Sequence, residues 1–308
     1  MSILRAADLR REFAPGRGVS GVSLQVERGE CFALLGRNGS GKTTFTRLLL
    51  GLDRPGAGTL EVLDCDVGEG GRRHLRNTAA VLDTSVHWEQ LSGRQNAWFF
   101  GRAHGIKGPD IERRLDHYAR RADLLEVLDD PVASYSFGMR RKLSIIEALG
   151  VEPDLLALDE PTTGVDVHFL PELADIARRR SEAGKTTWIA SNDAEWVAGV
   201  ASRVAFIEEG RIVAEGTVAE LIAEIAEVQR MRVVLDGYEQ MDLTGQKGLI
   251  AASQDGDAMD ILLENKPEWV ARTVDTIIGQ GGRVRSLEVR GTSLTDAFLA
   301  KTGRTLTP

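Results

Sequence analysis

Residues 36–43 read Gly36-Arg37-Asn38-Gly39-Ser40-Gly41-Lys42-Thr43 and fill every fixed position of the phosphate-binding loop pattern G-x-x-x-x-G-K-[ST]. In such a loop, glycines let successive backbone N–H groups turn toward phosphate oxygens, and the next helix points the positive end of its dipole at them. The flanks agree, because 31–35 is apolar like a buried strand and 44–50 follows an amphipathic helical pattern. We therefore expect residues 36–43 and Thr44 to bind a nucleoside triphosphate, with Lys42 on its β- and γ-phosphates and Thr43 on Mg²⁺.

A second apolar run, over 155–158, ends in the carboxylates of Asp159 and Glu160. Such a run is typical of a buried strand in a parallel sheet, and the carboxyl end of that strand lies beside the phosphate loop in open α/β folds. We expect Asp159 to hold Mg²⁺ through water and Glu160 to polarise the water that attacks the γ-phosphate. The alternative interpretation is that these two acids are merely solvated at a strand end.

An octapeptide between these motifs, Tyr135-Ser136-Phe137-Gly138-Met139-Arg140-Arg141-Lys142, precedes a helical pattern over 143–149. It resembles the signature motif of ATP-binding cassette (ABC) proteins, and the two other motifs then correspond to their Walker A and Walker B sequences. The resemblance implies that Ser136 and Gly138 bind the γ-phosphate of an ATP held by a second cassette in a head-to-tail dimer. Serine and glycine at a helix start also suit ordinary capping, so the order of the three motifs carries the resemblance.

Further segments fit the same family. Phe13 stands where these proteins have an adenine-stacking aromatic residue, although a core phenylalanine is the competing interpretation. Residues 161–166 resemble the D-loop, which crosses the dimer interface, and Asp166 is the residue that corresponds to it. Residues 207–217 resemble the paired strands that close a cassette.

Three positions depart from the family pattern. Asn192 follows the predicted strand 186–191, at the place of the switch histidine, and its neutral amide donates hydrogen bonds but cannot accept and return a proton as imidazole does. Asp83 takes the place of the Q-loop glutamine and keeps an oxygen ligand for Mg²⁺, whereas Gln90 is the alternative if the loop is longer. Phe137 replaces a glycine of the commonest signature.

Composition excludes several classes of protein. The 308 residues are 42% hydrophobic and 27% charged, which is ordinary for a globular protein with room for two domains. No run of about 18 apolar residues is present to span a bilayer, and the start of the chain lacks the apolar region of a secretory signal. Two cysteines without metal-type spacing predict neither a disulfide framework nor a zinc site. A net charge of −8 argues against nucleic acid as the main partner.

The expected fold is an α/β P-loop NTPase of the ABC cassette type, followed by a small C-terminal α+β domain. The resemblance implies a parallel-sheet core with an antiparallel β subdomain and an inserted helical subdomain. We expect the cassette at 1–216, its helical subdomain at about 83–149, a capped linker helix over 217–227 within a linker to 230, and the appendage at 231–308. Within the appendage we expect strands at 231–235, 258–263 and 283–290 and a helix at 267–279. The tail 293–304 is similar to that of daunorubicin-exporter-like cassettes.

Aromatic residues are crowded into 86–91 and 96–101. We expect most of them in the core, and the resemblance places part of this surface in the groove that receives a coupling helix of a membrane permease.

The resemblance implies an ATPase subunit of an ABC exporter that uses ATP and Mg²⁺ on the cytoplasmic face of a separately encoded permease, with turnover reduced by Asn192. Its partners would be that permease and a second cassette, in a homodimer or a heterodimer. The alternative is a nucleotide-binding, weakly hydrolysing regulatory half of an asymmetric heterodimer. Asn192, Asp83 and Phe137 favour this alternative, and Glu160 argues against it.

Overall fold

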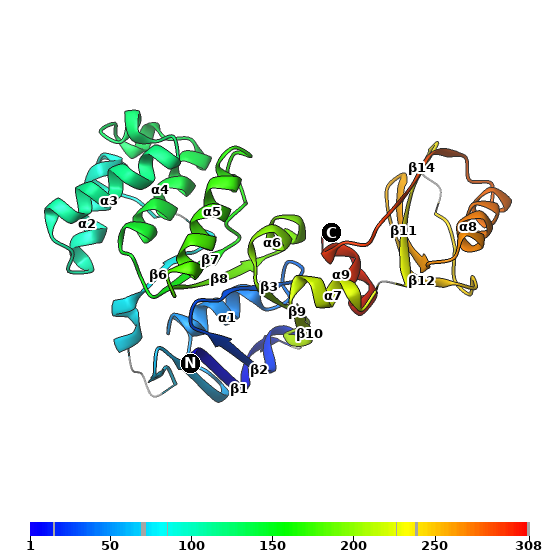
Figure 1. The fold of residues 1–308 in the computed structure, drawn as a ribbon, viewed down its shortest axis with the longest axis horizontal. Helices are drawn as coiled ribbons and strands as arrows, with labels where there is room; N and C mark the ends of the chain where they lie inside the picture. The colour runs from blue at the N-terminus through cyan, green and yellow to red at the C-terminus, as the bar shows by residue number, and fades with distance from the viewer. Residues whose placement is uncertain (15, 69–71, 85, 226, 238–239, 307–308) are drawn as a thin grey trace. The chain divides into compact units, whose positions relative to one another are not determined.

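The structure is a computed structural model that describes residues 1–308 except 15, 69–71, 85, 226, 238–239 and 307–308. The chain divides into two compact units, Met1–Ile212 and Val213–Pro308. Figure 1 colours the chain continuously from blue to red, so the second unit takes the yellow to red end of the scale. The division falls inside one strand and lies close to the domain boundary that the sequence predicts.

The first unit contains an antiparallel sheet of four strands in the order β2-β1-β4-β5. Its long strands alternate buried apolar and exposed polar residues, so one face packs on the core. The strands are β1 (Ser2–Ala14), β2 (Arg17–Glu27), β4 (Ala57–Val62) and β5 (Cys65–Asp66).

A second sheet has the order β10-β9-β3-β8-β7-β6, and the pairs β9·β3, β3·β8, β8·β7 and β7·β6 are parallel. Its strands β3, β7 and β8 are buried along their whole length, as strands covered on both faces are. The strands are β3 (Cys31–Leu35), β6 (Thr78–Val81), β7 (Leu155–Asp159), β8 (Thr186–Ser191), β9 (Arg203–Glu208) and β10 (Arg211–Gly216). The parallel-sheet core and the antiparallel β subdomain expected from the sequence are thus confirmed.

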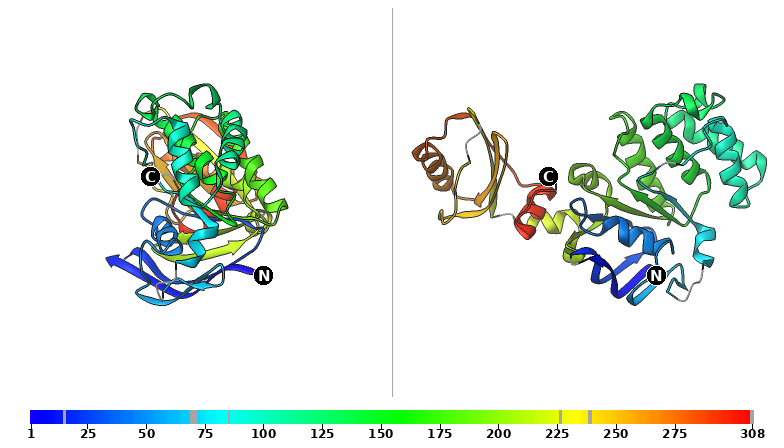
Figure 2. Two further views of the ribbon diagram at one scale, coloured as in Figure 1. Left: turned by 90° about the vertical axis from the view of Figure 1, so that its left-hand side faces the viewer. Right: turned by 180° about the vertical axis from the view of Figure 1, so that it is seen from behind.

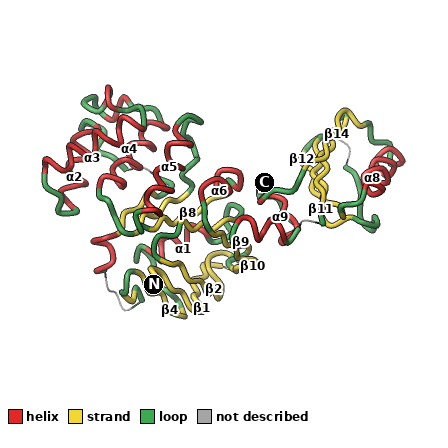
Figure 3. The backbone as a smooth tube through the Cα atoms, in the orientation of Figure 1, coloured by secondary structure: helices red, strands yellow, loops and turns green. Residues whose placement is uncertain are grey.

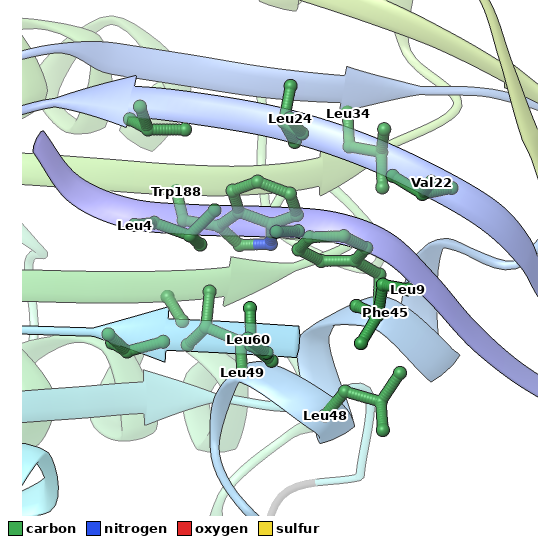
Figure 4. Packing of buried hydrophobic residues seen from close by; sticks show 14 of the residues in the cluster. Leu4, Leu9, Val22, Leu24, Leu34, Phe45, Leu48, Leu49, Leu60 and Trp188 are labelled. Carbon is green, nitrogen blue, oxygen red and sulfur yellow. The ribbon is translucent and has the colours of Figure 1, made fainter. Parts of the chain in front are cut away.

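Trp188 anchors the core between these two sheets (Figure 4). Its ring stacks on Phe45 with centroids 4.9 Å apart and on Phe32 at 5.6 Å, and its indole N–H donates to the Thr46 hydroxyl at 3.0 Å. Phe45 and Thr46 belong to α1 (Lys42–Leu49), so this packing fixes the helix that follows the phosphate loop against the sheet.

Three longer helices lie between β6 and β7 in the chain and form the inserted helical subdomain (Figures 1 and 3). They are α2 (Gly93–Ala103), α3 (Gly108–Arg121) and α4 (Phe137–Gly150), accompanied by the short 3₁₀ turns Leu125–Val127 and Val132–Ser134. A further 3₁₀ turn, Arg73–Asn77, directly precedes β6. Two further helices, α5 (Phe169–Glu182) and α6 (Ala194–Val200), alternate with the strands β7, β8 and β9.

The expectation that most aromatic residues near 86–101 are in the core is wrong. Trp88 is 51% exposed, Trp98 45% and Phe99 52%, and the Trp88 and Phe99 rings meet edge to face at 4.4 Å. The buried residues of α2 are small or polar, namely Gly93, Asn96, Ala97 and Gly101, and Trp98 and Phe99 lie on its exposed side.

The second unit has an antiparallel sheet in the order β12-β13-β11-β14, and α8 lies beside this sheet (Figure 2). Trp269 and Ile277 of α8 pack against buried residues of the strands. Its elements are α7 (Val218–Ala223), β11 (Val228–Leu235), β12 (Leu249–Asp255), β13 (Ala258–Glu264), α8 (Pro267–Gly279), β14 (Val284–Arg290) and α9 (Leu294–Thr302). The expected α+β architecture is confirmed, but the sequence reasoning missed β12.

The linker helix is shorter than expected. A capping box of Thr217 and Glu220 starts α7, which ends at Ala223, and residue 226 lies outside the described residues. Val228, which has helical spacing in the sequence, instead opens β11 opposite Glu264. The tail of the chain forms α9, which contacts α7 and pairs Lys301 with Glu224 at 2.5 Å.

The two cysteines occupy different environments. Cys31 begins β3 and is buried, and burial raises the pKa of its thiol to about 12. Cys65 lies in the short strand β5, is half-buried, and like Cys31 is free of disulfides. None of the helices in the described part of the chain is long and apolar enough to cross a membrane.

Candidate functional site

The phosphate loop connects the buried strand β3 to α1, as the sequence predicts. Gly39 and Gly41 have φ values of +83° and +115°, a conformation that side-chain-bearing residues rarely adopt. A Cβ atom at Gly41 would also lie 2.2 Å from the carbonyl oxygen of Gly18. The loop therefore needs glycine at this position both for its backbone conformation and for its close approach to β2.

Lys42 is buried at the start of α1, and three oxygens surround its ammonium group. Its Nζ donates to the carbonyl oxygens of Gly36 at 2.7 Å and Arg37 at 3.1 Å, and it pairs with Glu160 Oε1 at 3.0 Å. A buried cation is stable only when it is paired and hydrogen-bonded. The Glu160 carboxylate supplies the charged partner of this cation.

A cavity of about 690 Å³ opens over this loop. Ten of the predicted site residues line it, and they are Phe13, Asn38, Gly39, Gly41, Lys42, Thr43, Thr44, Asp83, Glu160 and Asn192. The volume of the cavity and its cationic residue Lys42 fit a nucleotide with its phosphates over the loop. Gly36, Arg37 and Ser40 belong to the same loop but are not among the lining residues.

Three lining residues were missed by sequence reasoning, namely Arg17, Gly18 and Thr163. Arg17 and Gly18 begin β2, close to Phe13 across the β1–β2 connection, and Arg17 brings a second cation to the cavity. Thr163 follows Glu160 by three positions. The sequence shows that each of these three residues is close to a predicted site residue. It does not show which of the nearby side chains face the cavity.

Phe13 is 60% exposed at the end of β1, so the interpretation of it as a core phenylalanine is wrong. The Arg11 guanidinium lies 5.0 Å from its ring centroid. An exposed ring at the wall of a nucleotide-sized cavity is free to stack on a flat base.

Asp159 ends β7 and is fully buried beside Thr43. Burial raises the pKa of its carboxyl group to about 6, against the opposing effect of the Thr43 hydroxyl. Neither carboxylate oxygen accepts a hydrogen bond of normal geometry from the described residues. A buried carboxylate with spare acceptor capacity fits an Mg²⁺ site, and Asp83 adds a further oxygen at the cavity wall.

The protein supplies only a few oxygen ligands at this site. In the part of the chain that the structure describes, no group of three His, Cys, Asp or Glu side chains could hold a metal ion without further ligands. Mg²⁺ commonly keeps several waters and binds one or two carboxylates together with substrate phosphates. The donor set of Thr43, Asp159 and Asp83 suits that mode of binding.

Asn192 follows β8 and reaches the cavity. Its backbone N–H donates to Glu160 Oε2 at 3.1 Å, and its side-chain amide donates to Asn38 Oδ1 at 3.4 Å. An asparagine therefore stands between the phosphate loop and the Walker B carboxylate. Asp83 also lines the cavity, whereas Gln90 is exposed and is not among the lining residues.

The signature residues lie at the start of α4. Ser136 caps the helix by accepting from the backbone N–H of Met139 at 3.2 Å, and Phe137 is 61% exposed. The Phe137 ring lies on Gly164 of the D-loop so closely that a Cβ atom there would be 2.2 Å from it. The glycine at 164 thus accommodates the aromatic residue that replaces a signature glycine.

Neither the signature residues nor Asp166 line the cavity over the phosphate loop. The Asp166 carboxylate accepts from Lys142 Nζ at 2.9 Å and from the backbone N–H of Phe169 at 3.1 Å. The structure therefore brings together the Walker residues, Phe13, Asp83 and Asn192, and it keeps Ser136, Gly138 and Asp166 apart from them.

Comparison with known proteins gives a consistent family. Residues 19–163 match the family model described as ABC transporter. The daunorubicin resistance ATP-binding protein DrrA3 of Streptomyces coeruleorubidus is 33% identical over 305 residues, which cover 95% of this chain and 93% of that protein. The Nod factor export ATP-binding protein I of Ralstonia nicotianae is 34% identical over 220 residues, covering 71% of this chain and 68% of that protein.

Among solved structures, one described as the ATP binding subunit of an ABC transporter has a TM-score of 0.67 at 26% identity. The match covers 72% of this chain and 93% of that structure. The covered part of this chain is about as long as the first compact unit, Met1–Ile212. The similarity therefore supports the cassette fold of that unit.

Proposed function

Because this chain belongs to the ATP-binding subunits of ABC transporters, we propose that it hydrolyses MgATP to power export through a separately encoded membrane permease. The observation that carries the proposal is the cavity where Lys42, Glu160 and Asn192 converge over the phosphate loop. The names of the similar proteins, which refer to drug resistance and to Nod factor export, support export as its direction.

The Lys42–Glu160 ion pair suggests how binding prepares hydrolysis. A triphosphate over the loop offers Lys42 a stronger anionic partner than the carboxylate that it contacts at 3.0 Å. Glu160 then loses its cation and becomes available to orient and polarise a water in line with the γ-phosphate. Nucleotide binding would in this way release the general base at the moment when it is needed.

Thr43, Asp159 and Asp83 would hold Mg²⁺, which neutralises charge on the phosphates. Phe13 would stack on the adenine, and Arg17 would add positive charge to the cavity wall. Phosphoryl transfer depends mainly on positioning and charge neutralisation, and these residues supply both.

The separation of the signature residues from this cavity supports a dimer of cassettes. Ser136, exposed Phe137 and Gly138 stand at the start of a fourteen-residue helix whose N-terminus favours anions. In a head-to-tail pair this helix start would close the cavity of the second cassette and contact the γ-phosphate. Two such composite sites would form in each dimer.

The exposed aromatic surface of Trp88, Trp98 and Phe99 supports docking to a permease. Large exposed aromatic side chains that touch one another are typical of protein interfaces. The chain would then work as a peripheral subunit on the inner face of the cell membrane, with the permease rather than nucleic acid as its partner.

The test is MgATP binding by calorimetry and steady-state hydrolysis by the purified full-length chain, with and without its permease. We expect binding and measurable hydrolysis, and we expect the Glu160→Gln variant to bind without significant turnover. A wild-type chain that fails to bind MgATP would overturn the proposal.

A second candidate function is the regulatory half of an asymmetric heterodimer, and Asn192 favours it. Its neutral amide, hydrogen-bonded to Asn38, cannot exchange a proton near the γ-phosphate as histidine does. If this function is correct, the tagged chain purifies from its native cells with a different cassette, and it binds MgATP but hydrolyses it weakly even with the permease present.

A further inference from the structure

Arg141 is a fully buried charged side chain of the cassette, with only 1% of its surface exposed. It lies on α4, five positions after Ser136. Its guanidinium group donates to the backbone carbonyl oxygens of Leu82, Asp159 and Glu160, the last at 3.0 Å. A buried guanidinium needs such acceptors, and all three of these belong to the backbone.

The three carbonyl groups come from the parts of the chain that carry the chemistry. Leu82 directly precedes Asp83, while Asp159 and Glu160 end β7. The strands β6 and β7 are parallel neighbours, with Val81 opposite Leu158, so Arg141 links their carboxyl ends where the nucleotide cavity opens. Arg141 itself is not among the residues that line this cavity.

The backbone of Glu160 needs such support. Its φ of +47° lies in the left-handed region, which is unfavourable for a residue with a side chain. The Glu160 N–H donates to the Ala190 carbonyl at 2.8 Å, and the Glu160 carbonyl accepts from Arg141. With both backbone groups held, the carboxylate is directed toward Lys42 and Asn192.

Neighbouring side chains of α4 have other partners. Lys142 pairs with Asp166 of the D-loop at 2.9 Å, and Arg140 contacts Glu89 at 3.3 Å. Of these three side chains, Arg141 is the one that donates to the backbone carbonyl groups of Asp159 and Glu160. Its planar fork can serve several acceptors at once, which a lysine ammonium does with less geometric control.

We infer that Arg141 is a positioning residue for hydrolysis, which holds the backbone of Glu160 and of the segment before Asp83 in place and ties both to the signature helix. The inference rests on the proposed function, since it names a determinant of the same reaction. It predicts that Arg141 affects the chemical step and leaves nucleotide binding to the phosphate loop.

The cassette provides a matched control in Arg180 of α5. This side chain is also buried, and it donates to the carbonyl oxygens of Pro153 at 3.0 Å and Thr186 at 3.2 Å. Those residues lie at the amino ends of β7 and β8, whereas the nucleotide cavity is at their carboxyl ends. Removing Arg180 thus tests the structural cost of losing a buried arginine that contacts the opposite end of the same sheet.

The experiment measures kcat and KM for MgATP, ATP affinity and thermal melting of the full-length wild type, Arg141→Met, Arg141→Lys and Arg180→Met. We expect Arg141→Met to lower kcat by roughly 10- to 100-fold, the usual consequence of a misplaced reacting group, with KM within about twofold of wild type. Arg141→Lys should recover part of the loss. Arg180→Met should lower the melting temperature and leave kcat within about twofold.

The same substitutions in a Glu160→Gln background separate positioning from general damage. Once the base is absent, Arg141→Met should reduce the residual kcat by less than about twofold, because residues that act as one unit are not additive. If Arg141→Met does not fold, Arg141→Lys is compared in both backgrounds instead.

Three results would overturn the inference while leaving the proposed function intact. They are an equal loss of kcat in Arg141→Met and Arg180→Met, a full further loss of kcat when Arg141→Met is added to Glu160→Gln, and a wild-type kcat in the Arg141 variants. Absence of MgATP hydrolysis by the wild type, with and without the permease, would instead contradict the proposed function.

Discussion

The phosphate-loop side and the signature side of the nucleotide site differ in how far a single chain completes them. On the first side, Lys42, Glu160 and Asn192 converge on one cavity and already contact one another. On the second side, Ser136 and exposed Phe137 stand at a helix start and do not line that cavity. If the proposed dimer of cassettes is correct, one chain binds the nucleotide and hydrolysis needs two, and the following variants test this contrast.

The largest effect is expected from Lys42→Ala, which removes the buried cation of the phosphate loop. The lost charge-assisted contact is worth about 1.5–3 kcal/mol, and the variant leaves the half-buried Glu160 without its cation. ATP binding at cellular concentrations and turnover should both disappear. Calorimetry on the variant checks this, with Thr46→Ser inside α1 as a control, and unchanged affinity would refute the assignment of the loop.

The next effect in size is that of Glu160→Gln. The variant keeps the shape of the side chain and its neighbours, so ATP affinity should stay normal. Hydrolysis should slow by roughly 10²–10⁴-fold, the usual worth of a positioned base. Size-exclusion chromatography with ATP should then show a stable dimer, and equal turnover in the two proteins would show that Glu160 is not the base.

Gly138→Ala tests the signature side alone. A Cβ atom at this position would lie 2.6 Å from the Gly164 carbonyl oxygen and displace the helix start. We expect turnover to fall by roughly 10²-fold, the worth of a lost donor to a developing charge, with ATP binding to the single chain unchanged.

Mixing two inactive variants sharpens the comparison further. A dimer of one Lys42→Ala chain and one Gly138→Ala chain contains one intact composite site if the arrangement is head to tail. Equal mixing should then restore about a quarter of wild-type turnover, because half of the dimers are mixed and half of their sites are intact. No recovery on mixing would mean that both motifs serve the same chain.

The smallest effect is expected at Asn192. Asn192→His should raise turnover several-fold, since imidazole can exchange a proton beside the γ-phosphate, while ATP affinity stays the same. The gain should vanish in Asn192→His/Glu160→Gln. A variant slower than wild type, measured with the permease present, would show that this site has been built around asparagine and that the chain is a full ATPase.

The sequence predicted most of the cassette because its informative positions are local. The phosphate loop needs glycine where φ is positive, and the strand at 155–158 needs apolar residues on both of its faces. Both patterns can therefore be recognised from consecutive residues, without knowledge of the tertiary contacts. Asp83 and Asn192 were located because each follows a buried strand whose end could be read from the chain.

The predictions were wrong or incomplete at positions whose structure depends on residues far away in the sequence. The pattern of apolar residues could not tell the buried face of α2 from the exposed face that carries Trp98 and Phe99. Val228 continued a helical spacing, but pairing with Glu264 recruited it into β11. The contacts of Arg17 and Thr163 with the cavity, like the reach of Arg141 to three carbonyl groups, depend on tertiary packing that no local pattern records.

The unequal surroundings of the two thiols give the native chain a selective labelling site. Only a thiolate reacts readily with maleimides, and the buried Cys31, with its pKa raised to about 12, stays protonated and covered at neutral pH. Cys65 is partly accessible on the edge strand β5 of the antiparallel sheet. A fluorophore or spin label therefore attaches at Cys65 without any cysteine being removed, and it can report distances between two chains as nucleotide is added.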